Sequence, residues 1–89
     1  MKLKYEMEIL TIGDDITAVP VGTDADEYHG VLRLNGSARE IVELLRQDTD
    51  LAAITAALAE KYTENTTEEI ASMAARCVDK LRAEGLITE

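Results

Sequence analysis

Few side chains in this chain could carry out catalysis. Its 89 residues include one cysteine, Cys77, and one histidine, His29, which lie far apart in the sequence. A nucleophile needs a base within hydrogen-bond reach, and a zinc site needs about four ligands at characteristic spacings. The sequence also has no glycine-rich phosphate loop. We therefore expect no catalytic residue, no metal ion and no cofactor.

Cys77 and His29 both have plain structural interpretations. Cys77 falls on the inward stripe of an expected helix, where a cysteine usually acts as a small buried hydrophobe. A reactive thiol would need exposure and cationic neighbours. Arg76 and Lys80 are near in sequence, but we expect their side chains to point away from the core. His29 is expected on the outward face of a strand, either solvated or touching a peptide.

Carboxylates are abundant but form no recognisable calcium loop. Asp14-Asp15 and the run Asp-Ala-Asp-Glu at 24–27 could attract a cation, yet the longer ligand series is missing. The chain has 18 acidic and 9 basic residues, a net charge of −9. This charge repels nucleic acid and anionic membranes and favours a partner with a basic patch.

The sequence also predicts where the protein works. Its N-terminus lacks the apolar core of a signal peptide, and no apolar run is long enough to cross a bilayer. A single cysteine fits a reducing compartment. We expect a cytoplasmic protein.

Hydrophobic periodicity predicts three strands followed by three helices, in one domain of residues 1–89. Strands are expected over about 5–12, 16–21 and 28–34, with a turn at Gly13-Asp14-Asp15. The third strand alternates, with one face of Gly30, Leu32 and Leu34 and another of His29, Val31 and Arg33.

Helices are expected over about 37–47, 50–62 and 66–84. Capping boxes are predicted at Ser37 with Glu40 and at Thr66 with Glu69, and Asp50 is the expected cap of the second helix. The inward stripe of the third helix is expected to hold Ile70, Ala74, Cys77 and Leu81. The fold class is α+β: a three-stranded antiparallel β-meander followed by a three-helix bundle, like a winged helix-turn-helix.

In winged helices the last helix often reads DNA. Here that helix begins Thr66-Thr67-Glu68-Glu69, which places acid where phosphates would approach. We therefore expect no nucleic-acid binding. An acidic winged-helix module for protein interaction, associated with transcription, remains the alternative function.

The third strand and the third helix could form a groove. Unpaired N–H and C=O groups on a strand edge are a template for an added strand, which also allows a homodimer. On a helical wheel, Met73 borders the buried face, with Arg76 and Lys80 beyond it. This flank could face a partner, or Met73 could border the core while the two cations are solvated.

Residues 34–45, Leu-Asn-Gly-Ser-Ala-Arg-Glu-Ile-Val-Glu-Leu-Leu, resemble the PqqD family, whose usual run is Leu-Asn-x-Thr-Gly-x-x-Ile-Trp-x-Leu-Leu. These are the small proteins of pyrroloquinoline quinone biosynthesis and their relatives, the RiPP precursor peptide recognition elements. Further matches lie at 19–22, 61–62 and 81–87, so the resemblance covers nearly the whole chain. The departures are Ser37 for Thr, Ala38 for Gly, Val42 for Trp, Met73 for Asp and Cys77 for Phe.

The resemblance implies a non-catalytic adaptor. Family members bind the leader segment of a ribosomally made precursor peptide and present it to a modifying enzyme, often a radical S-adenosylmethionine protein. The leader adds a strand to the third strand and lies against the third helix. Carried onto this chain, the peptide-binding residues would be His29, Val31, Leu32, Arg33, Leu34, Met73, Arg76, Cys77 and Lys80.

Overall fold

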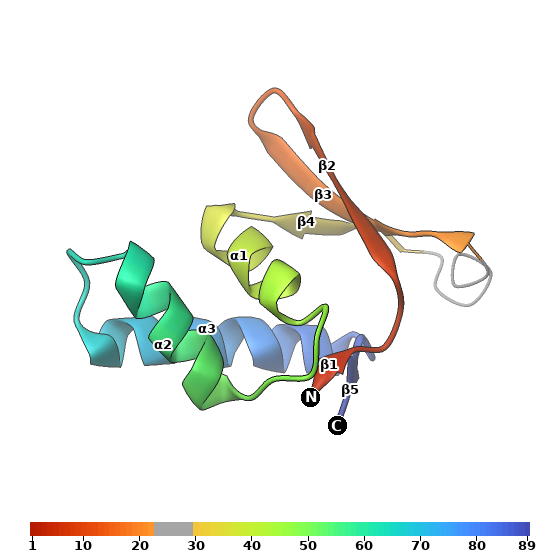
Figure 1. Ribbon diagram of the computed structural model, residues 1–89. Coiled ribbons are helices and arrows are strands. Elements are labelled where there is room, and N and C mark those ends of the chain that lie inside the picture. Colours follow the sequence, from red (N-terminus) through yellow and green to blue (C-terminus); the bar gives the residue numbers. More distant parts are fainter. Residues whose placement is uncertain (23–29) are drawn as a thin grey trace.

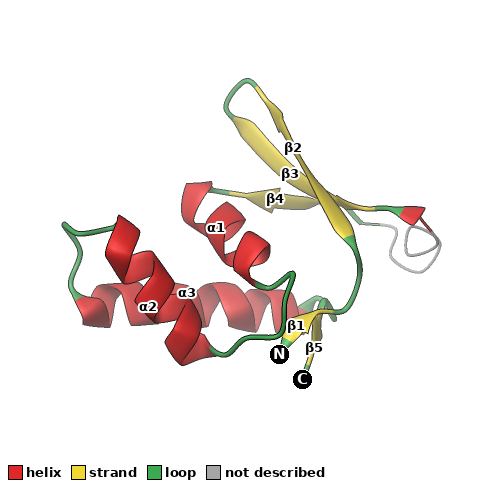
Figure 2. Ribbon diagram, in the orientation of Figure 1, coloured by secondary structure: helices red, strands yellow, loops and turns green. Residues whose placement is uncertain are grey.

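A three-stranded antiparallel sheet lies beside three helices in the computed structural model (Figures 1 and 2). The structure describes residues 1–22 and 30–89, so the expectations for His29 and for the acidic run at 24–27 lie outside the described residues. The sheet order is β2 (Met7–Ile12), β3 (Asp15–Pro20) and β4 (Leu32–Leu34). The helices are α1 (Gly36–Leu44), α2 (Leu51–Lys61) and α3 (Thr67–Ala83). The predicted α+β class, with a β-meander and three helices, is confirmed.

The β2–β3 hairpin has a two-residue turn at Gly13 and Asp14, between the paired residues Ile12 and Asp15. Gly13 has a φ of 60°, which suits a hairpin turn with glycine at its first central position. The predicted turn is thus where we expected it. The second strand begins and ends one residue earlier than expected.

β4 is shorter than the predicted strand over 28–34. Its three residues pair with β3, and neither Gly30 nor Val31 belongs to the strand. The next position of β3 that would donate a hydrogen bond toward β4 is Pro20, which has no N–H. The ladder therefore stops at the pair Ala18–Leu32.

The cap of α1 differs from the prediction. Asn35, rather than Ser37, is the N-cap, and its side-chain oxygen accepts a hydrogen bond from the Ala38 N–H at 2.8 Å. Ser37 Oγ donates to the same oxygen at 2.9 Å. Glu40 pairs with Lys61 of α2 instead of reaching back to the helix start. The Ser37–Glu40 capping box was therefore a wrong prediction, because Asn35 satisfies the free N–H first.

The other two predicted caps are present. Asp50 accepts from the Ala53 N–H at 2.7 Å. Thr66 and Glu69 form the full capping box, with bonds of 3.1 Å and 2.9 Å. The bond from the Thr66 backbone lowers the pKa of the Glu69 carboxyl.

A second, two-stranded sheet joins the chain ends, which lie side by side in Figure 1. β1 (Lys2–Leu3) pairs antiparallel with β5 (Ile87–Thr88). The Lys4 N–H also donates to the Leu86 carbonyl at 2.8 Å. The sequence did not predict this sheet, because two-residue strands are too short to show periodicity.

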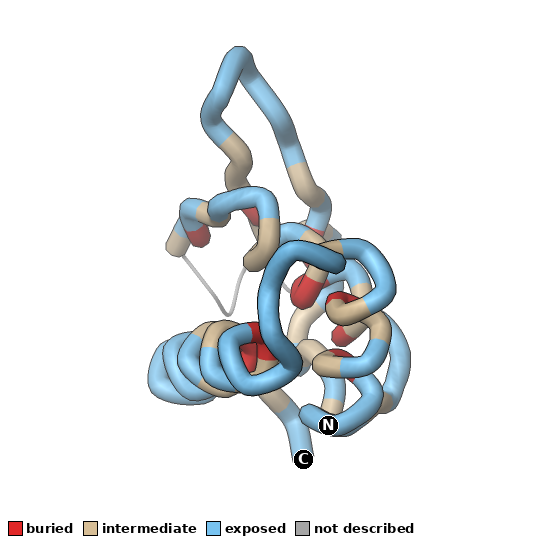
Figure 3. The backbone as a smooth tube through the Cα atoms, turned by 90° about the vertical axis from the view of Figure 1, so that its left-hand side faces the viewer, coloured by how far each residue is buried: buried red, intermediate tan, exposed pale blue. Residues whose placement is uncertain are grey.

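Among the described residues, thirteen hydrophobic side chains form one core where the helices meet each other and the sheet, while the tip of the β2–β3 hairpin is exposed (Figure 3). α3 contributes Ile70, Ala74, Val78 and Leu81. Cys77, expected on this inward stripe, is only half-buried. Ile70, Ala74 and Leu81 are buried as predicted, whereas Val78 is buried in place of its neighbour Cys77.

Candidate functional site

β4 is the last strand of its sheet, so one of its two edges is open within the described residues. Opposite residues in an antiparallel pair alternate between hydrogen-bonded and non-bonded positions. The two-residue turn makes Ile12–Asp15 a hydrogen-bonded pair, so every second residue of β3 from Asp15 onward bonds to β2. The Val21 N–H fits this alternation, since it donates to the Glu6 carbonyl at 3.0 Å. The other residues of β3, Ile16 and Ala18, therefore bond to β4.

The register then determines which groups of β4 face outward. Ile16 and Ala18 are opposite Leu34 and Leu32, so the backbones of these two leucines are used by β3. Arg33 lies between them, and its N–H and C=O therefore face the open edge. One residue of β4 thus offers both a donor and an acceptor to an incoming strand.

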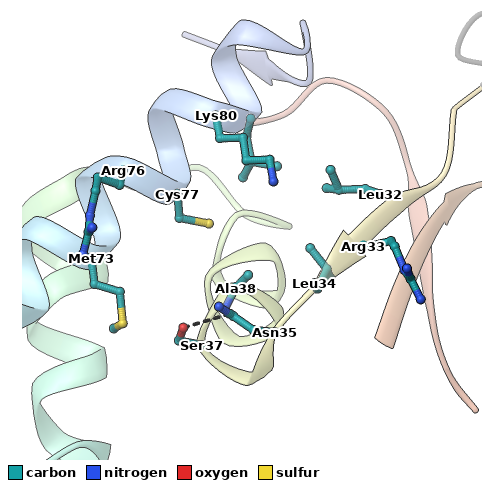
Figure 4. A pocket seen from close by; sticks show the side chains of 11 residues that line it. Leu32, Arg33, Leu34, Asn35, Ser37, Ala38, Met73, Arg76, Cys77 and Lys80 are labelled. Carbon is teal, nitrogen blue, oxygen red and sulfur yellow. Dashed lines mark hydrogen bonds between the residues drawn. The ribbon is translucent and has the colours of Figure 1, made fainter. Parts of the chain in front are cut away.

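Side chains on β4 alternate between its two faces. Leu32 and Leu34 point toward α3, whereas the Arg33 side chain extends to the far side of the strand (Figure 4). There its guanidinium lies 3.2 Å from Asp15. Only the backbone of Arg33, and not its side chain, is therefore on the side of β4 that faces α3.

A hollow of about 360 Å³ lies between β4, the first turn of α1 and α3 (Figure 4). Its lining residues are Leu32, Arg33, Leu34, Asn35, Ser37, Ala38, Met73, Arg76, Cys77, Lys80 and Leu81. We call this the β4–α3 groove.

The groove brings together most of the residues singled out from the sequence. Those that line it are Leu32, Arg33, Leu34, Met73, Arg76, Cys77 and Lys80. Val31 lies just outside the lining and is 60% exposed, and His29 is not among the described residues.

Four lining residues were missed: Asn35, Ser37, Ala38 and Leu81. The first three directly follow β4 and open α1. A helix that is separated from a strand by a single residue must place its first turn beside the end of that strand. This short connection was therefore the available signal.

Cys77 contributes a neutral thiol to the groove. Burial raises its pKa above the ordinary value, and the charge of Lys80 only partly opposes this effect. A thiol with a raised pKa stays protonated at neutral pH and acts as an apolar surface rather than as a nucleophile.

The start of α3 is unsuited to nucleic acid. Its first turn carries Glu68 and Glu69, and Glu69 is held at the helix end by Thr66. Within residues 1–22 and 30–89, no group of three or more His, Cys, Asp or Glu side chains is placed to hold a metal ion. None of the helices in these ranges is both long enough and apolar enough to cross a bilayer.

Comparisons with known proteins agree with this geometry. The solved structure "TbiB1 in Complex with the TbiA(beta) Leader Peptide" has the same fold, with a TM-score of 0.73 over 100% of this chain and 98% of that chain, at 16% sequence identity. A search of curated proteins finds no match. The family model for coenzyme PQQ synthesis protein D (PqqD) matches residues 22–87. Since this match spans well over half of the chain, the protein belongs to the PqqD family.

Proposed function

We propose that this protein is a non-catalytic adaptor that binds the leader segment of a ribosomally made precursor peptide as an added strand on β4. The observation that carries the proposal is the open edge of β4, which faces α3 across the β4–α3 groove. PqqD-family membership supports it, and so does the solved structure of similar fold, which contains a leader peptide.

The groove is where an added strand would lie. Neighbouring strands are about 4.8 Å apart, so a peptide paired with Arg33 runs along the groove beside β4. Every second side chain of the peptide then faces α3. Leu34, Met73 and Cys77 offer those side chains a half-buried apolar surface.

Backbone pairing alone is too weak to hold the peptide. Two hydrogen bonds to Arg33 contribute about 2 kcal/mol, whereas association costs at least about 4 kcal/mol. Burying one large apolar side chain adds about 1.5–3 kcal/mol. The side chains in the groove therefore decide both whether a peptide binds and which one.

The adaptor would present its peptide to a modifying enzyme, such as a radical S-adenosylmethionine protein. Among the described residues, those that line the groove include a neutral thiol but no histidine or carboxylate that could act as a base, which supports an adaptor that leaves the chemistry to another enzyme. A cytoplasmic location fits the single cysteine.

Amide chemical-shift titration tests the proposal directly. The ¹⁵N-labelled chain is titrated with synthetic peptides that correspond to short reading frames beside the gene. We expect one peptide to shift the amides of Arg33, Leu34 and Cys77, while the opposite sheet edge at Ile9 and Thr11 stays unchanged. The proposal fails if no peptide moves the β4 amides, or if both edges respond alike.

A further inference from the structure

The β4–α3 groove has the opposite charge to the molecule as a whole. The chain has 18 acidic and 9 basic residues. None of the described residues that line the groove is acidic, whereas α3 contributes Arg76 and Lys80, which are both exposed. An anionic group would therefore meet a favourable local field in this groove, although the protein as a whole is strongly acidic.

Arg76 and Lys80 also lack ion-pair partners in the described ranges. Of the other seven lysines and arginines, four are paired with carboxylates: Arg33, Arg46, Lys61 and Arg82. The nearest acid toward the start of α3, Glu69, already accepts a hydrogen bond from the Thr66 N–H. Like charges four residues apart on a helix repel modestly, and a bound carboxylate would relieve that repulsion.

The spacing of the two cations matches an extended peptide. Four residues of helix rise by about 6 Å, and side chains on one face of a strand are about 6.7 Å apart. α3 and β4 run side by side along the groove, with Lys80 near Leu32 and Met73 toward Ser37 (Figure 4). If a peptide pairs with β4, each of its groove-facing side chains is therefore opposite one turn of α3, and the next such side chain is opposite the next turn.

The rest of the groove is apolar and has room to spare. Leu34, Ala38, Met73 and Cys77 are all half-buried. The volume of the groove is about 360 Å³. The small side chains Ala38 and Cys77 leave space that one large apolar side chain would fill.

Building on the proposed strand addition, we propose that the preferred ligand is an acidic extended peptide with two groove-facing side chains, two residues apart. One is large and apolar and lies between Leu34 and Cys77. The other is an aspartate or glutamate and is held by Lys80 or Arg76. The groove thereby selects against basic peptides of the same shape.

Capped synthetic peptides test this selectivity without knowledge of the natural ligand. The probe is acetyl-Thr-Thr-Leu-Thr-Glu-Thr-Thr-amide, with variants carrying Gln or Lys for Glu, or Ala for Leu. Each is titrated into the whole ¹⁵N-labelled chain at low salt. We expect the Leu/Glu peptide to bind tightest and the Gln variant to bind about 5-fold more weakly. The Lys variant should be weaker again, and the differences should shrink at high salt.

Two double variants test the role of the cations, one in the groove and one as its matched control. Arg76→Gln with Lys80→Gln should abolish the preference for Glu, while Lys2→Gln with Arg39→Gln changes the net charge equally, away from the groove, and should keep it. If the Glu and Lys peptides bind equally and both shift the Arg33 and Leu34 amides, the charge selectivity is wrong and strand addition stands. If no probe peptide shifts these amides, the acidic-peptide proposal is wrong, and strand addition is decided separately by the titration with peptides encoded beside the gene.

Discussion

Arg33 presents different groups to the two sides of β4. Its side chain forms an ion pair with Asp15 in which both partners are mostly exposed, at 77% and 69%, so the pair adds little stability. Its backbone N–H and C=O face the open edge. The two roles can be separated by mutation, because one belongs to the side chain and the other to the main chain.

Arg33→Pro should weaken peptide binding by about 5- to 10-fold, because it removes the outward N–H and its hydrogen bond of about 1–1.5 kcal/mol. Arg33→Gln removes the side-chain charge but keeps the N–H, and it should bind nearly normally. Thr11→Pro makes the same backbone change on the opposite, β2 edge of the sheet. The affinity of the three variants is measured by peptide titration, after circular dichroism has shown that each is folded. Equal losses of affinity in Arg33→Pro and Arg33→Gln would contradict strand addition.

The Cys77 thiol should react slowly. Because burial raises its pKa, the thiolate fraction at pH 8 is smaller than that of an unshifted cysteine. We expect alkylation by iodoacetamide to be slower in the native chain than in urea at the same pH, and to slow further when a peptide fills the groove. Mass spectrometry follows both rates. A native rate that matched the unfolded one, with or without peptide, would show that Cys77 is not part of a covered surface.

At the scale of elements, local signals were the reliable ones. The turn at Gly13, the cap at Asp50 and the box at Thr66 all depend on residues close in sequence. The length of β4 does not, because it is limited by Pro20 across the sheet. The cap of α1 was ambiguous, since Asn35 and Ser37 are both good capping residues and lie two positions apart.

The corrected cap makes a testable difference. Asn35→Ala should lower the free energy of unfolding by about 1 kcal/mol, because it leaves the Ala38 N–H without its partner. Ser37→Ala should cost less, since Ser37 only donates to Asn35. Urea denaturation of both variants gives the comparison. A larger loss for Ser37→Ala would restore Ser37 as the cap.

At the scale of the whole molecule, the groove is assembled from two distant parts of the chain, residues 32–38 and 73–81. The wheel of α3 predicted that Met73, Arg76 and Lys80 share one flank, since that follows from the helical period alone. It placed Cys77 too deep, because a helical wheel does not show which of the two neighbours, Cys77 or Val78, the core covers. The spacing of residues along a helix predicts which side chains share a face. How exposed each of those side chains is depends on tertiary packing.

Leu86 anchors the end of α3 and should be essential. It is fully buried and its carbonyl accepts from the Lys4 N–H, so it ties the C-terminal segment to the N-terminal one. Leu86→Ala should cost about 2–5 kcal/mol, a large share of the roughly 5–15 kcal/mol that stabilises a domain. Leu10→Ala, at a leucine of β2 that is 39% exposed, is the matched control and should cost far less. Thermal unfolding of both variants tests this. Equal losses would mean that the burial of Leu86 contributes no more to stability than that of a half-exposed leucine, and that it does not anchor the end of α3.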